Sequence, residues 1–230
     1  MKALIYKELK LAMHPICYIF IIAFPFMILI PNYPVAIGFI YILSAYPILF
    51  LGANKGQQSN DLLFSTLLPI RKKDIVLARI ITLVIMHVTF TVITCLLSPL
   101  AKFIQSSIPL DPSLEGIVSQ GLTVDGIVSV VGLALMGLAI SDLIYLPIYY
   151  KNGKSIVLST LLSIFFFVTF ISVTTIVIPC MPEFIGYYNF LCNEGIWNQL
   201  LVFGIGLIIY IVVHILVYKI SSKRLEKVDF

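Results

Sequence analysis

The sequence predicts an all-α, polytopic membrane protein with six transmembrane helices, an N-terminal amphipathic helix and a short helix in a cytoplasmic loop. Hydrophobic residues make up 60% of the chain, charged residues only 11%, and the mean hydropathy is +1.06. Soluble domains carry about 45–50% apolar and about 25% charged residues. The apolar residues are also grouped into long runs, and the basic residues lie between alternate runs. A soluble domain of this length has too little interior for so much apolar side chain, so its solvent is predicted to be lipid.

The six spans follow from the need for about 20 apolar residues to cross a bilayer. We expect them at residues 16–30, 35–53, 75–98, 127–149, 156–178 and 199–218. The first two are separated by "PNYP" at residues 31–34, where paired prolines break the helix. Residues 1–230 are expected to form one membrane domain without a soluble domain.

The basic residues predict the orientation. All but one of the 15 lysines and arginines fall in the N-terminal segment, at the second and fourth connections or in the C-terminal tail. With six spans these regions share one side of the membrane, and only Lys102 lies opposite. The positive-inside rule places both termini in the cytoplasm.

The N-terminal segment, residues 1–15, is predicted to be an interfacial helix. At about 100° per residue, Lys7, Lys10 and His14 fall on one stripe. The opposite arc carries Leu4, Ile5, Leu9, Ala12 and Met13. Such a helix lies along the leaflet with its lysines toward the headgroups. The alternative is a plain basic leader before the first span.

Two of the connections have a predicted structure. In the cytoplasmic segment 54–74, "DLLFSTLL" supplies two helical turns that Pro69 ends. One face of this helix is apolar and too short to span, a form suited to docking in a partner's groove; it carries Leu63, Phe64, Leu67 and Leu68. The external segment 179–198 is rich in aromatic residues, which favour the headgroup level, so an interfacial or re-entrant hairpin is expected.

Groups for catalysis or metal binding are sparse. The three histidines lie in different elements without ligand spacing, so we expect neither a catalytic nor a metal site. His87 falls within the third span, where an interhelical hydrogen bond or a functional role would explain it. Asp142 lies inside the fourth span and either pairs with a nearby basic or hydroxyl group or serves ion coupling. Cys180 and Cys192 share the last external segment and can form a disulfide or remain reduced.

Four stretches together resemble the type-2 ATP-binding cassette (ABC) exporter permeases. "LLPIRKKD" with the helix before it is similar to that family's loop between the second and third helices, and "LPIYYKNGKS" is similar to the end of its fourth span. The "KELK" segment and the closing "SSKRLEKVDF" fit the family's ends.

The resemblance implies a role for each stretch. The N-terminal helix becomes an elbow helix, the segment 179–198 a re-entrant hairpin, and residues 61–68 a coupling helix that docks on an ATPase. The coupling residues it implies are Asp61, Leu63, Phe64, Leu67, Leu68, Arg71, Lys72 and Lys73. The partners it implies are cytoplasmic ABC ATPase subunits and a second permease copy, identical or not. ATP and Mg²⁺ would bind the partner ATPase, and this chain would be neither an enzyme nor a nucleic-acid binder.

The leading functional hypothesis is therefore a permease subunit of an ABC exporter in a bacterial plasma membrane. Its aromatic-rich spans suit an amphipathic or hydrophobic cargo such as a peptide, toxin or antimicrobial. Two alternatives remain open: an ion-coupled secondary transporter that uses Asp142 and His87, and a non-transporting immunity or sensor protein.

Overall fold

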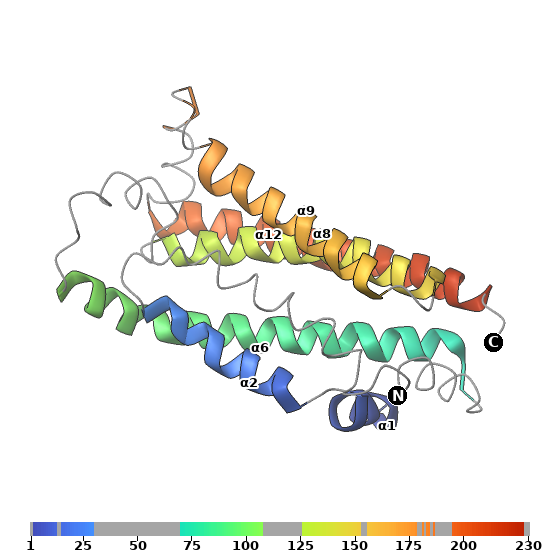
Figure 1. Ribbon diagram of the computed structural model, residues 1–230. Helices are drawn as coiled ribbons and strands as arrows, with labels where there is room; N and C mark the ends of the chain where they lie inside the picture. The colour runs from blue at the N-terminus through green and yellow to red at the C-terminus, as the bar shows by residue number, and fades with distance from the viewer. Residues whose placement is uncertain are drawn as a thin grey trace.

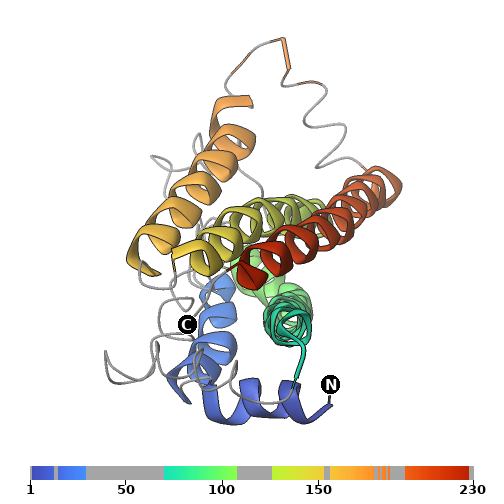
Figure 2. The ribbon, with the colours of Figure 1, turned by 90° about the vertical axis from the view of Figure 1, so that its right-hand side faces the viewer.

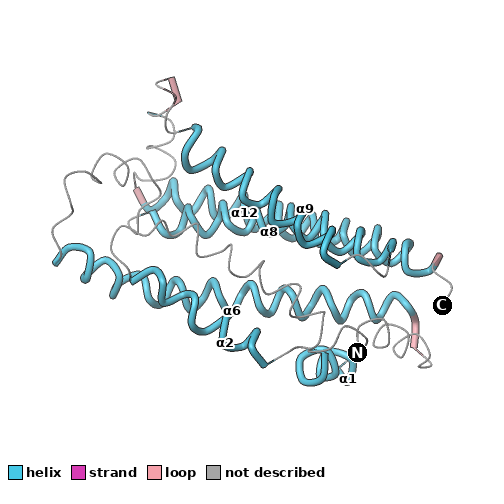
Figure 3. The backbone as a smooth tube through the Cα atoms, viewed as in Figure 1, coloured by secondary structure: helices cyan, strands magenta, loops and turns pink. Residues whose placement is uncertain are grey.

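The computed structural model is helical over almost all of the chain that it describes. The described residues are 2–12, 15–29, 70–107, 126–152, 156–178, 181, 183–184, 186 and 195–227. No strand occurs within these ranges (Figure 3). The predicted second span, the segment 54–69 and most of the external segment 179–198 lie outside them.

Within the described residues, two short helical segments come first and four longer ones follow. Helix α1, Lys2–Lys7, continues as the π-helical turn η1, Glu8–Ala12. Helix α2, Pro15–Ala23, continues as the 3-10 segment η2, Phe24–Leu29. The longer segments are α6 (Lys72–Ser107), α8 (Ile127–Asn152), α9 (Ile156–Ser172) with its π-helical end η4 (Val173–Val177), and α12 (Ile196–Glu226).

Three helices are long and apolar enough to cross a membrane, at Lys72–Ile104, Ile127–Lys151 and Ile196–Glu226. They coincide with the third, fourth and sixth predicted spans. The shorter apolar helices Ile16–Leu29 and Leu158–Ser172 coincide with the first and the fifth. The described part of the chain is thus a helical membrane protein, as the hydropathy predicted.

The helices form a row in which each packs against the next (Figures 1 and 2). Helix α9 packs on α8, α8 on α12, α12 on α6, and α6 on α2 and η2. Helix α1 and η1 run across the row beside the start of α6, as Figure 2 shows. The Tyr18 hydroxyl donates a hydrogen bond to the Leu9 carbonyl and braces η1 against α2. This crosswise placement is the one expected for an interfacial helix.

One end of the row collects the basic residues, and we call it the basic end. Helix α1, the start of α6, the end of α8 and the end of α12 all lie there (Figure 1). The basic side chains on or next to these elements include Lys2, Lys7, Lys10, Arg71, Lys72, Lys73, Arg79, Lys151, Lys219, Lys223, Arg224 and Lys227. The separation of charge that the sequence shows along the chain is therefore also a separation in space.

Helix α8 is the most buried of the three long helices, and the outer faces of the row are apolar. In the most apolar window of α8, 61% of the residues are buried, against 28% for α12. Large hydrophobic side chains point outward from the other helices, including Leu96, Phe103 and Phe165. Water would make such a surface costly, whereas lipid tails are as apolar as these side chains.

The α8–α12 contact depends on two glycines that let the backbones touch. A Cβ on Gly132 would lie 2.8 Å from the Phe203 Cα atom, and a Cβ on Gly206 would lie 2.9 Å from the Gly132 Cα atom. Small residues permit this close approach, which favours helix association where no hydrophobic effect drives it.

Candidate functional site

Three basic residues that the family resemblance assigned to the coupling segment lie where α6 begins. Arg71 precedes the helix, and its carbonyl accepts the Asp74 backbone N–H at 2.9 Å. Lys73 forms an ion pair of 3.3 Å with Glu226 near the end of α12, and both side chains are about half exposed. The chain thus enters α6 through a polar, accessible turn at the basic end.

The other residues of that segment, Asp61, Leu63, Phe64, Leu67 and Leu68, lie outside the described residues. Cys180 and Cys192 do so as well, so their pairing stays a prediction.

Lys7 and Lys10 of the N-terminal helix have short-range partners. Lys10 donates a hydrogen bond of 2.6 Å to the Tyr6 hydroxyl, one turn away. The Lys7 ammonium lies 3.9 Å from the Glu8 carboxylate. Lys10 is exposed, as a headgroup contact requires.

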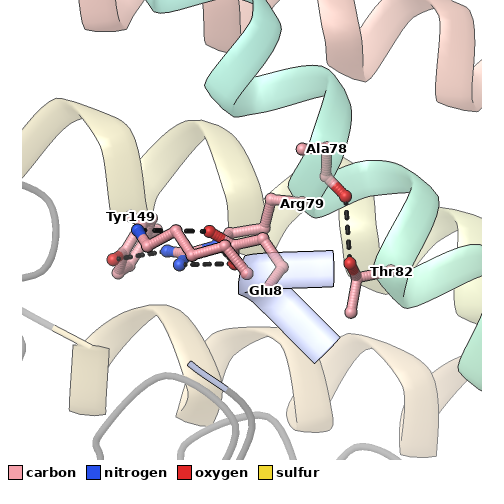
Figure 4. A network of polar contacts seen from close by, with 6 residues as sticks. Glu8, Ala78, Arg79, Thr82 and Tyr149 are labelled. Atoms are coloured by element: carbon pink, nitrogen blue, oxygen red, sulfur yellow. Dashed lines mark hydrogen bonds and ion pairs between the residues drawn. The ribbon is translucent and has the colours of Figure 1, made fainter. Parts of the chain in front are cut away.

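A buried ion pair joins this N-terminal helix to two spans (Figure 4). Arg79 of α6 donates through Nε and Nη2 to the Glu8 Oε2 atom, at 2.9 and 2.8 Å. Its Nη1 donates to the Tyr149 hydroxyl of α8 at 3.0 Å. Each of the three residues is only 3% exposed. We call this group the Glu8–Arg79–Tyr149 network.

This network was not predicted, although the amino-acid sequence contains a signal for it. Arg79 is an arginine that lies two turns inside an apolar span, where a charge is costly without a partner. Glu8 is the acidic residue of the otherwise basic N-terminal helix. A basic residue inside an apolar span and an acidic residue in a basic helix are potential partners. They were not paired because they are 71 residues apart in the sequence.

A second buried polar group lies deeper in the row, where α6, α8 and α12 meet. Nε2 of His214 lies 3.0 Å from Asp142 Oδ2, and Nδ1 of His87 lies 3.8 Å from the same oxygen. The Tyr210 hydroxyl lies 2.9 Å from His87 Nδ1. His87 and Asp142 are fully buried, and His214 is 8% exposed. We call these four residues the histidine–aspartate cluster.

The cluster unites residues that the sequence analysis treated separately. His87 has an interhelical hydrogen bond, to Tyr210 of α12. Asp142 contacts two histidines, His87 and His214. His214 was assigned no role, because its position in the last span gave no hint that it faces α8.

The ends of α8 and α12 are also joined by hydrogen bonding. Arg224 Nη1 donates to the Pro147 carbonyl at 2.6 Å. Pro147 lies inside α8, where a proline disturbs the local hydrogen-bond ladder. This contact and the Glu8–Arg79–Tyr149 network hold four elements together at the basic end.

In the described residues, a row of helices with apolar outer faces and charge gathered at one end defines a helical membrane protein. Comparison with family models gives the class its name: residues 3–226 match the model described as ABC-2 family transporter protein. The chain belongs to this family, as the sequence resemblance indicated, and is a membrane permease of an ABC-type transporter. No curated protein and no solved structure matches it significantly.

Proposed function

We propose that this chain is the membrane subunit of an ABC exporter, which forms the translocation path together with a second permease copy. The family match carries this proposal, because it extends over residues 3–226 and so includes both ends of the chain. Family membership in general implies an ABC ATPase partner. ATP and Mg²⁺ bind that ATPase, and this chain contributes no catalytic residue.

The proposed topology has six spans in a bacterial plasma membrane, with the basic end in the cytoplasm. Its support is the gathering of basic residues where α1, the start of α6 and the end of α12 lie (Figure 1). Cytoplasmic loops carry an excess of lysine and arginine. On this topology α1 and η1 form an elbow helix in the inner leaflet, and the part of the segment 179–198 that precedes α12 is external and re-entrant.

Energy reaches the permease through residues 61–68, which we propose as the coupling helix. This segment directly precedes Arg71, Lys72 and Lys73, at the basic end where an ATPase would dock. Its apolar face, Leu63, Phe64, Leu67 and Leu68, fits a groove in a partner.

The proposed cargo is an amphipathic or hydrophobic molecule such as a peptide, toxin or antimicrobial. The apolar, aromatic-rich helix faces support this choice, because such a cargo partitions into a path without many charges. The buried charges of the described spans pair with one another, and those pairs leave the outer faces apolar.

The test is to purify the chain from its native membranes and measure the co-purifying ABC ATPase and its ATP-driven cargo export. Phe64→Asp and Leu67→Asp should each lower ATPase association at least about tenfold, because a charge on the docking face has to be desolvated. Thr66→Asp is the matched control, since it adds the same charge outside that face.

Wild-type ATPase association in both variants would refute the coupling helix. Export that continues with a catalytically dead ATPase, but stops when the proton gradient collapses, would refute the ABC exporter and support secondary transport.

A further inference from the structure

The histidine–aspartate cluster has a hydrogen-bonding pattern that requires either a proton or a metal ion between two of its members. His214 Nδ1 lies 2.8 Å from the Tyr210 backbone carbonyl, which can only accept, so this nitrogen carries a proton. The other ring nitrogen, Nε2, then has a lone pair unless the ring is charged. It faces Asp142 Oδ2 at 3.0 Å, and an ionised carboxylate is also only an acceptor. A positive charge, either a proton or a metal ion, has to lie between the two.

A proton between Asp142 and His214 does not join His87 to the carboxylate, because the hydrogen-bond partner of His87 Nδ1 is the Tyr210 hydroxyl. His87 Nδ1 lies 3.8 Å from the same Asp142 oxygen, which is too long for a hydrogen bond. A metal ion, in contrast, binds every ligand atom that surrounds it. The ligand atoms of His87, Asp142 and His214 all lie within 4.8 Å of one another.

We propose that His87, Asp142 and His214 bind one divalent transition-metal ion of the zinc type between α6, α8 and α12. Two imidazoles and one carboxylate are ligands that suit Zn²⁺, whereas Mg²⁺ and Ca²⁺ prefer oxygen alone. Ligand bonds of about 2.0–2.1 Å place neighbouring ligands of a tetrahedral zinc site about 3.3 Å apart. The distances of 3.0 and 3.8 Å to Asp142 Oδ2 lie on either side of that value.

The surroundings of the ligands also fit a metal site. Metal-binding histidines usually donate their second ring N–H to a carbonyl or carboxylate, and His214 does so to the Tyr210 carbonyl. The Tyr210 hydroxyl lies 2.9 Å from His87 Nδ1, which makes it the candidate for a fourth ligand. As a phenolate it would complete the site and make it neutral, because one carboxylate and one phenolate balance two positive charges. Binding would therefore release two protons, the phenol proton of Tyr210 and the proton between Asp142 and His214.

The sequence gave no sign of this site, because its ligands come from three spans and Asp142 and His214 are 72 residues apart. The site is also independent of the transport cycle proposed above, since it rests only on side-chain geometry. Its function is to hold helices α6, α8 and α12 together.

Cobalt(II) is the probe for the test. The untagged full-length chain, purified in detergent and stripped with a chelator, is titrated with Co²⁺, and the visible bands of tetrahedral cobalt and the metal content per chain are measured. We expect one Co²⁺ per chain, displacement by Zn²⁺, no displacement by Mg²⁺, and a higher unfolding temperature with Zn²⁺.

Variants then assign the ligands. Asp142→Asn and His214→Gln should abolish stoichiometric binding, and Tyr210→Phe should weaken it about 10- to 100-fold. His14→Gln is the control, because it removes the third histidine of the chain from the N-terminal segment, and it should bind as the wild type does.

Less than a tenth of a Co²⁺ ion per folded wild-type chain would overturn the proposal, whatever the variants do. So would wild-type binding by the Asp142→Asn and His214→Gln variants, which would identify the metal as adventitious. If these variants misfold, the proposal is judged from the wild type by its tetrahedral Co²⁺ spectrum and by the rise of its unfolding temperature with Zn²⁺.

Discussion

Replacing Glu8 with alanine should destabilise the protein strongly, because it leaves the buried Arg79 guanidinium without its carboxylate. Arg79 is 3% exposed, and two of its three described hydrogen bonds, at 2.8 and 2.9 Å, go to Glu8. Removing one partner of a buried ion pair costs about 3–5 kcal/mol, since the remaining charge is neither paired nor hydrated. We therefore expect the free energy of unfolding to fall by about 3–5 kcal/mol.

The structure provides a matched control at the same end of the row. Lys73 and Glu226 form an ion pair of 3.3 Å, but the two side chains are 53% and 46% exposed. Exposed pairs contribute about 0–1 kcal/mol, so Glu226→Ala should have little effect. The free energies are measured by denaturant titration in mixed micelles, with helicity as the signal.

A double variant separates the ion pair from the packing. Glu8→Leu combined with Arg79→Met replaces both charges with apolar side chains of similar size, and such replacements are often neutral or stabilising. The double variant should then be more stable than Glu8→Ala. The reasoning would be refuted if Glu8→Ala cost no more than Glu226→Ala, or if the double variant were the less stable of the two.

Three further substitutions test the contacts of α8 and α12. Gly206→Ala should lower the free energy of unfolding by about 1–3 kcal/mol, because its Cβ would overlap the Gly132 backbone. Gly204→Ala is the control and should be neutral or slightly stabilising, because nothing lies within 4 Å of its Cβ. Equal effects of the two substitutions in the same unfolding assay would contradict the close crossing of α8 and α12. Tyr149→Phe should lower the free energy of unfolding by about 1–3 kcal/mol, because it removes the hydroxyl that accepts from Arg79 Nη1. A loss as large as that of Glu8→Ala would show that the hydroxyl, and not the carboxylate, is the main partner of the guanidinium.

The sequence predicted the class of fold well, because the bilayer imposes a length and a composition on every span. The helices Lys72–Ile104, Ile127–Lys151 and Ile196–Glu226 fall on predicted spans for this reason. Charge predicted the basic end, since lysine and arginine are costly inside lipid and collect outside it. The coupling residues 61–68 stay predictions based on family resemblance.

The contacts between helices could not be predicted in the same way. Hydropathy fixes the depth of a residue in the membrane, but it does not say which neighbour the residue faces. The spans are apolar all around, so the usual apolar stripe that would reveal a buried face is absent. Glu8 with Arg79, and Asp142 with His214, therefore became visible as pairs only in the folded chain.

Helix α6 contacts its neighbours through buried polar side chains at two positions, in addition to its apolar packing. Arg79 and His87 are eight residues apart on α6, which is about 12 Å along the helix axis. Arg79 bonds to the N-terminal helix and to α8, and His87 contacts α8 and α12. Apolar contacts in lipid can slide at little cost, because lipid tails replace them, whereas a buried ion pair or hydrogen bond has to be broken as a whole. A force applied at Lys72, where α6 begins, should therefore not shift α6 alone: it moves α6 with α8 and the N-terminal helix as one body, or it breaks the Glu8–Arg79–Tyr149 network first.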